Sequence, residues 1–155
     1  MEVLMGRRDA SWASSEAVRR SMRGNTSQDT KPELLVRREL FRRGLRFRVD
    51  YRLAPPQRTR ADVVFTRARV ALFVDGCFWH GCPVHATTPK SNAAYWLPKL
   101  QANRDRDVAT TALLIEQGWT VLRFWEHEPV SAVADAVEDA VRAASPQSLR
   151  PRIVR

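Results

Sequence analysis

Residues 70–85 read VALFVDGCFWHGCPVH, an apolar run that leads directly into a stretch of cysteine, histidine and aromatic residues. A second apolar run, residues 63–65, precedes it, and only the four residues 66–69 separate the two runs. Short, continuous apolar runs joined so closely predict a hairpin of two buried strands. We therefore expect a Gly/Cys/His/Pro loop to follow a buried strand that ends near residue 74.

The segments on either side of this hairpin carry further helix and strand signals. Thr30 and Glu33 have the spacing of a capping box at a helix start, Gly44 is expected to end that helix, and Pro98 either kinks a second helix or divides it in two. The elements expected outside the hairpin are helices over residues 30–44, 91–117 and 130–143 and strands over residues 45–53 and 119–125. This order predicts an α/β domain whose central mixed sheet is flanked by helices.

The length and charge of the chain favour one domain that binds nucleic acid. The 155 residues suffice for a single domain, which we assign to residues 29–144, between a basic N-terminal arm of residues 1–28 and a basic C-terminal tail of residues 145–155. Lysine and arginine number 26 against 17 acidic residues, a net charge of +9, and only three of them are lysines. Arginine matches phosphate oxygens in pairs, which indicates a nucleic-acid partner, but a GC-rich genome that favours arginine codons explains the same excess.

Neither a membrane span nor an export signal is expected. No window approaches 18 uninterrupted apolar residues, and after Met5 the N-terminus turns to arginine and serine without the apolar stretch of a secretory signal. We therefore expect a bacterial cytoplasmic protein with no membrane partner, a monomer associated with the nucleoid.

Two carboxylates lie at the end of the expected hairpin. If residues whose numbers sum to 135 pair, Asp62 faces Phe73 and lies diagonal to Asp75 on the same side of the sheet. Such diagonal neighbours are about 7 to 8 Å apart, close enough for both to bind one hard cation. The alternative is that Asp62 is a solvated residue at a strand end or pairs with an arginine such as Arg60.

The loop after the hairpin has the spacing of a zinc site. Cys77, Cys82 and His85 offer three soft ligands, and a structural zinc site requires four. His127, at the end of the next strand, is the remaining candidate, and His80 competes for the same place. The alternative is that the cysteines are small core residues and the histidine is an ordinary surface residue.

Phe78 and Trp79 stand side by side in this loop. Adjacent residues on a loop held by a metal do not both point easily into one core, so at least one is expected to be exposed. Exposed aromatic rings on a basic protein can wedge between bases. The alternative is that both rings pack on the underside of the loop.

These motifs resemble the very-short-patch mismatch repair endonucleases, the Vsr family, from about residue 22 to residue 128. The resemblance covers Arg23-Gly24-Asn25, residues 30–35, Asp62, residues 74–80 and 92–96, Asn103 with Asp107, and residues 118–126. It implies a restriction-endonuclease-like fold and a magnesium-dependent, strand-specific nick 5′ to the thymine of a T:G mismatch.

The resemblance also implies a role for each residue of a hydrolytic site. Asp62 resembles the magnesium ligand, with the backbone carbonyl of Val74 as a second ligand. His80 resembles the general base that activates water, and Asp107 resembles the residue that orients it. Glu33 matches an acidic residue near the metals. Restriction-type nucleases commonly place a lysine two residues after the second acid, and because no lysine lies there in this chain, His80 is the substitute.

DNA contacts are implied in the same way. Phe78, Trp79 and Trp96 match aromatic residues that intercalate beside the mismatch. The N-terminal arm, which contains Arg23 and Asn25, corresponds to a minor-groove clamp. The expected partner is therefore double-stranded DNA with a T:G mismatch, and other mismatch repair proteins are further candidates.

Three positions depart from the family pattern. His127 stands where a cysteine is usual, which changes the zinc ligands to two cysteines and two histidines. Asp75 stands where some members have histidine, and it is a candidate magnesium ligand. Pro98 interrupts the helix that carries Trp96. Two other functions stay open: a zinc-stabilised DNA-binding module without catalysis, and a restriction-type endonuclease that cuts unmatched duplexes.

Overall fold

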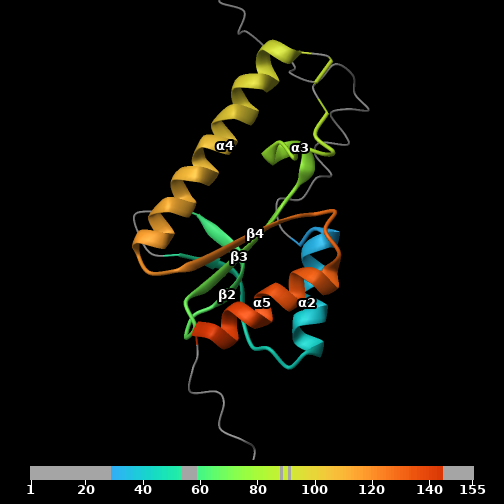
Figure 1. Cartoon of the computed structure of the whole chain (residues 1–155). Helices are drawn as coiled ribbons and strands as arrows, with labels where there is room; N and C mark the ends of the chain where they lie inside the picture. Colours follow the sequence, from blue (N-terminus) through green and yellow to red (C-terminus); the bar gives the residue numbers. More distant parts are fainter. Residues whose placement is uncertain (1–28, 54–58, 88, 91, 145–155) are drawn as a thin grey trace, which may run out of the picture.

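The computed structural model describes residues 29–53, 59–87, 89–90 and 92–144, which form a four-stranded sheet with helices on both faces (Figure 1). The elements, in chain order, are α2 (Lys31–Arg42), β1 (Arg48–Arg52), β2 (Arg60–Phe65), β3 (Val70–Asp75), α3 (Cys77–His80), α4 (Ala93–Glu116), β4 (Thr120–Trp125) and α5 (Val130–Ala144). The predicted α/β class is confirmed. The restriction-endonuclease-like fold and the domain boundaries stay predictions, and Arg23 and Asn25 lie outside the described residues.

The sheet is mixed, as the sequence predicts. Its strand order is β1-β2-β3-β4; the first three strands are antiparallel, and β4 runs parallel to β3. The pairing of Val64 with Ala71 confirms the predicted hairpin register. Because β3 and β4 are parallel, their carboxyl ends meet at one edge, where Asp75 pairs with Trp125.

Each face of the sheet has its own core. Helices α2 and α5 cover one face, where Leu40 and Val137 are fully buried against strand residues such as Leu72. Helix α4 reaches the other face through Leu114, which packs in a cluster with Phe73. Among the helices in the described ranges, none is both long and apolar enough to cross a bilayer.

The strand predicted over residues 45–53 is shorter than expected. Gly44 has a φ of +79°, and the N–H of Leu45 returns to the Leu40 carbonyl at 3.1 Å, so the chain is still leaving the helix there. Phe47 packs on the core without joining the sheet ladder, which begins at Arg48. A second irregularity is Asp50, whose φ of +44° interrupts the pairing of β1 with β2.

Two other expectations are corrected. The predicted loop after β3 contains a single helical turn, α3, which Gly81 ends with a φ of +72°. Pro98 does not divide the second long helix, because α4 continues through it. Proline removes only one hydrogen bond, to the carbonyl four residues earlier, and Ala94 lies near the helix start on an exposed position where water can replace that bond.

Candidate active site and metal centre

Asp62 lies on β2 opposite the end of β3. Its Oδ2 accepts a hydrogen bond of 2.7 Å from the N–H of Val74, and its Oδ1 has no hydrogen-bond partner among the described residues. Burial raises the pKa of Asp62 to about 6, the charges of Glu33 and Asp75 add to this rise, and the Val74 N–H opposes it. The charge of Arg37 also lowers the pKa of Asp62, but it does not outweigh burial and the two neighbouring carboxylates.

Glu33 is buried at the start of α2, with 5% of its surface exposed. Its carboxylate accepts hydrogen bonds from the Asp29 N–H at 2.9 Å, the Thr30 hydroxyl at 2.8 Å and the Arg37 guanidinium at 3.1 Å. The predicted capping box is thus altered, because Thr30 donates to Glu33 and makes no bond from its side chain to the helix backbone. Glu33 closes the helix start while its charge still reaches Asp62.

His80 and Asp107 form a hydrogen-bonded pair between α3 and α4. Nδ1 of His80 lies 2.5 Å from Oδ2 of Asp107 and 3.7 Å from Oδ1 of Asp75. The negative charge of Asp75 also raises the pKa of Asp62 on β2, whose carboxylate accepts a hydrogen bond from the neighbouring Val74 N–H. The structure therefore gathers four of the predicted site residues at the carboxyl end of β3.

Arg123 on β4 joins this group and was missed by the sequence analysis. Its Nε and Nη2 donate to the two oxygens of Asp75 at 2.8 and 2.7 Å, and Nη2 lies 3.0 Å from Oδ1 of Asp107. The guanidinium also lies over the ring of Phe73, 4.8 Å from its centre. One signal was available: an arginine in the middle of the strand predicted over residues 119–125 is rare without a partner if that strand is central, although the structure places β4 at the edge of the sheet.

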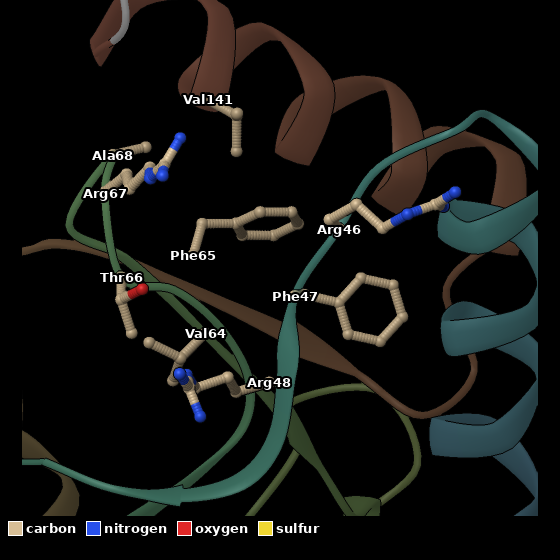
Figure 2. A pocket seen from close by; sticks show the side chains of 9 residues that line it. All are labelled: Arg46, Phe47, Arg48, Val64, Phe65, Thr66, Arg67, Ala68 and Val141. Atoms are coloured by element: carbon tan, nitrogen blue, oxygen red, sulfur yellow. The ribbon is translucent and has the colours of Figure 1, made fainter.

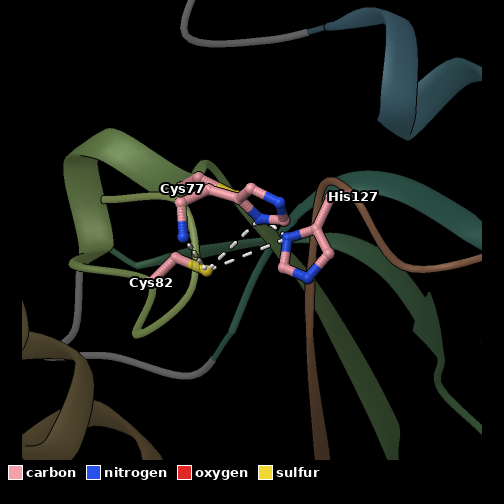
Figure 3. A group of neighbouring side chains, drawn as sticks. Cys77, Cys82 and His127 are labelled. Carbon is pink, nitrogen blue, oxygen red and sulfur yellow. Dashed lines mark hydrogen bonds between the residues drawn. The ribbon is translucent and has the colours of Figure 1, made fainter. Parts of the chain in front are cut away.

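Four cysteine and histidine side chains meet beyond this group, at the ends of β3 and β4. The candidate ligand atoms of Cys77, Cys82, His85 and His127 all lie within 4.8 Å of one another. Figure 3 shows His127 facing the two cysteines: its Nδ1 is 3.1 Å from the sulfur of Cys77 and 3.8 Å from that of Cys82. Nδ1 of His85 is 4.0 Å from the Cys82 sulfur.

The two thiols differ in acidity. Burial, the Cys82 sulfur and the Glu126 carboxylate raise the pKa of Cys77 to about 11. Burial acts on Cys82 in the same direction, but hydrogen bonds from the N–H groups of His85 and Val84 outweigh it and lower the pKa of Cys82. The loop backbone thus favours a thiolate at Cys82, the form that binds metals.

The aromatic residues pack together more closely than the sequence suggests. The rings of Phe78 and Trp79 lie edge to face, 5.1 Å apart, and Trp79 is 5.8 Å from Trp96. Phe78 and Trp79 are both half-buried, so the expectation that one is exposed is wrong, and Trp96 has only 7% of its surface exposed. Tyr95, next to Trp96, is 43% exposed.

A cavity of about 510 Å³ lies at the opposite end of the hairpin (Figure 2). Arg46, Arg48 and Arg67 line it around the rings of Phe47 and Phe65. In Figure 2 the three guanidinium groups extend in different directions, so they do not converge on one ligand. None of the predicted site residues lines this cavity.

Comparisons with known proteins identify the class of this protein. The sequence model of a family described as DNA mismatch endonuclease Vsr matches residues 13–85. The type II nicking enzyme V.NaeI of Lentzea aerocolonigenes is 44% identical over 124 residues, which cover 79% of this chain and 75% of that enzyme. V.XorIIP of Xanthomonas oryzae, also named a type II nicking enzyme, is 42% identical over 74% of this chain and 83% of its own.

The DNA mismatch endonuclease Vsr of Escherichia coli is 34% identical over 69% of this chain and 67% of its own length. The chain is therefore an endonuclease that acts on DNA. The chain belongs to the Vsr family of DNA mismatch endonucleases. This membership overturns the alternative of a DNA-binding module without catalysis.

Proposed function

We propose that this chain nicks one strand of double-stranded DNA 5′ to the thymine of a T:G mismatch, with magnesium, in very short patch mismatch repair. The observation that carries the proposal is the His80–Asp107 pair, which lies beside Asp75 at the strand end where Asp62 accepts a hydrogen bond from the Val74 N–H. The names of the relatives support both parts of it, because one is a mismatch endonuclease and others are nicking enzymes.

His80 is the general base of the proposed reaction. Asp107 accepts a hydrogen bond from Nδ1, so the ring presents Nε2 as its free acceptor. An imidazole in this tautomer can take the proton of the water that attacks the phosphorus atom. Asp107 then stabilises the imidazolium that forms, since the positive charge remains 2.5 Å from its carboxylate.

Asp62 is the proposed ligand of a divalent cation, together with the carbonyl of Val74. The unpaired Oδ1 and the raised pKa of Asp62 fit this role, because a cation would relieve the cost of an ionised carboxyl next to Glu33 and Asp75. Magnesium bound here would neutralise charge on the phosphoryl oxygens and assist the leaving oxygen. Glu33 contributes its charge to the same site.

Zinc is the proposed occupant of the Cys77, Cys82, His85 and His127 cluster. With Zn–S near 2.3 Å and Zn–N near 2.0 Å, the donor atoms of a tetrahedral site lie roughly 3.3 to 3.8 Å apart. The distances of 3.1, 3.8 and 4.0 Å among these side chains lie close to that range. Two sulfurs and two imidazoles, with no fifth donor needed, are typical of structural zinc.

The aromatic cluster is the proposed contact with the mismatch. Phe78 and Trp79 lie on the same helical turn as His80, so a base step that receives these rings lies close to the general base. Trp96, behind them, supports Trp79 at 5.8 Å. The partially exposed edges of Phe78 and Trp79 can stack on bases, and the N-terminal arm with Arg23 and Asn25 is expected to close on the minor groove.

The proposed setting is the nucleoid of a bacterial cytoplasm, where a monomer acts on chromosomal DNA. Other repair proteins are candidate partners.

The test uses duplexes that differ only in a T:G or T:A pair, with either strand labelled. Wild-type protein with magnesium should nick only the thymine strand of the T:G duplex. Asp62→Ala and His80→Ala should bind this duplex and leave it intact, whereas Asp139→Asn, a change at an exposed residue of α5, should nick it normally. Equal nicking of both duplexes would favour the restriction-type alternative, and cleavage without any divalent cation would remove magnesium from the proposal.

A further inference from the structure

Arg123 connects the two carboxylates that face His80. Its Nη2 lies between them, 2.7 Å from Oδ1 of Asp75 and 3.0 Å from Oδ1 of Asp107, and its Nε holds the second oxygen of Asp75 at 2.8 Å. Both oxygens of Asp75 are therefore engaged. Asp107 keeps Oδ2 for the imidazole.

The sheet fixes the position of this guanidinium. Arg123 pairs with Phe73 across the parallel β3–β4 ladder, and the guanidinium lies over the Phe73 ring at 4.8 Å. A planar group held by a ring on one face and by two carboxylates at its edge has little freedom. Its side chain has 21% of its surface exposed, and that of Asp75 has 11%, so water screens the pair only in part.

Without Arg123, the two carboxylates would compete for one imidazole. Nδ1 of His80 donates a hydrogen bond to Asp107 at 2.5 Å, and Oδ1 of Asp75 lies 3.7 Å from the same nitrogen. An uncompensated Asp75 would repel Asp107 and attract the ring toward itself, which would move Nε2 away from the reacting water. Arg123 neutralises the charge of Asp75 and donates hydrogen bonds to both of its oxygens, so Asp75 no longer competes with Asp107 for the imidazole.

We propose that Arg123 is a positioning residue for the general base: it holds Asp75 away from His80 and from the cation, and it fixes Asp107 as the partner of Nδ1. This role rests on the proposed function of His80. In this proposal Asp75 pairs with Arg123 and does not bind the cation, whose protein ligands are then Asp62 and the carbonyl of Val74. Arg123 itself touches neither the substrate nor the attacking water in this scheme.

Three variants test the proposal. Arg123→Met keeps the bulk of the side chain and removes its charge; we expect kcat for the T:G duplex to fall about 10- to 100-fold, with KM within about twofold of the wild type. Arg123→Lys, which cannot hold two carboxylates at once, should lose less activity and keeps the test valid if the methionine variant does not fold. Arg123→Met combined with Asp75→Asn should recover most of the lost kcat, because the competing charge is gone.

Arg69→Met is the matched control. Arg69 also lies over an aromatic ring, that of Trp119 at 5.0 Å, and binds backbone carbonyls, but it contacts none of the site residues. Its variant should keep kcat and KM. If the double variant is no more active than Arg123→Met, or if Arg123→Met has the wild-type kcat, the positioning role is wrong.

A measurement without DNA separates this proposal from the proposed function. The short bond between His80 and Asp107 should give a strongly downfield Nδ1 proton in the NMR spectrum, assigned through its loss in His80→Gln. Arg123→Met should shift or broaden that signal, and the added Asp75→Asn change should restore it. A signal unchanged in Arg123→Met refutes the positioning role whatever the substrate is, whereas a wild-type protein that shows the signal and does not nick T:G duplexes refutes only the proposed function.

Discussion

Replacing Asp62 with asparagine should stabilise the metal-free protein while it abolishes nicking. The pKa of this carboxyl rises from 3.8 to about 6 on folding, chiefly because it is buried, so the folded state holds a proton that the unfolded state releases between these values. The contribution of Asp62 to the free energy of unfolding therefore falls as pH rises from about 4 to 6 and stays constant above that range. Under the proposed function, the destabilising ionised carboxyl is retained because it binds the cation.

The pKa difference sets the magnitude of this effect. At about 1.4 kcal/mol per pH unit, the rise of the Asp62 pKa corresponds to about 3 kcal/mol above pH 6, and roughly half of this cost applies at pH 5. Asparagine can still accept the hydrogen bond from the Val74 N–H, but its amide group must also be desolvated. We therefore expect Asp62→Asn to be about 1 to 3 kcal/mol more stable than the wild type at pH 7.5, with a smaller difference at pH 5.

Urea unfolding at the two pH values measures this difference. Both proteins keep the same cysteine and histidine cluster, so the pH dependence of that cluster cancels in the comparison. Asp139→Asn serves as the control, because its side chain is 77% exposed, and it should change stability by less than about 0.5 kcal/mol. Added magnesium should stabilise the wild type and leave Asp62→Asn unchanged. An Asp62→Asn protein that is less stable than the wild type at pH 7.5, or a difference that is equal at both pH values, would refute this reasoning.

Three further outcomes are expected. The purified protein should contain about one equivalent of zinc, and Cys82→Ser should lower both the zinc content and the melting temperature; a metal-free preparation with normal melting contradicts this. Gly81→Ala should lower the free energy of unfolding in urea by roughly 1 kcal/mol, because Gly81 has a φ of +72° and an added Cβ would lie 2.6 Å from Nη1 of Arg104. The comparison variant Gly76→Ala should lower it less, because the atom nearest to its added Cβ is 3.5 Å away. The reverse order would be inconsistent with the geometry. Trp79→Ala should weaken binding to T:G more than to T:A duplexes, as measured by fluorescence anisotropy; equal weakening would make the ring a general DNA contact.

The parts of the site that lie on the hairpin could be predicted from the sequence. The four residues between the two apolar runs set the register of the hairpin, and this register places Asp62 opposite the end of β3. The spacing of Cys77, Cys82 and His85 within one loop is similarly local. His127 was predictable because it follows directly on β4, and parallel strands place their carboxyl ends together.

The interactions of Arg123 and Glu33 could not be predicted in the same way. The contact of Arg123 with Asp75 depends on how β3 and β4 align after a 24-residue helix, and no local pattern encodes that alignment. Glu33 fits a capping box by spacing, but its burial and its bonds to Asp29 and Arg37 depend on the packing of α2 against the sheet. The prediction that Phe78 or Trp79 is exposed was wrong for a related reason. Trp96, which belongs to α4, packs against Trp79 and covers part of a ring that the loop alone would leave exposed.

The same two strand ends support both the proposed zinc cluster and the proposed general base. Helix α3 begins with Cys77 and ends with His80; β4 carries Arg123, and the turn that follows β4 carries His127. The N–H of Cys77 also donates to the carboxylate of Glu126 at 2.7 Å, which ties α3 to the end of β4. A single helical turn has no independent stability, so its orientation depends on these attachments. If zinc occupies the proposed cluster, its loss would displace His80 from Asp107 before the sheet unfolds. In excess magnesium, nicking should therefore disappear at concentrations of a zinc-selective chelator that leave most of the far-ultraviolet circular dichroism signal unchanged.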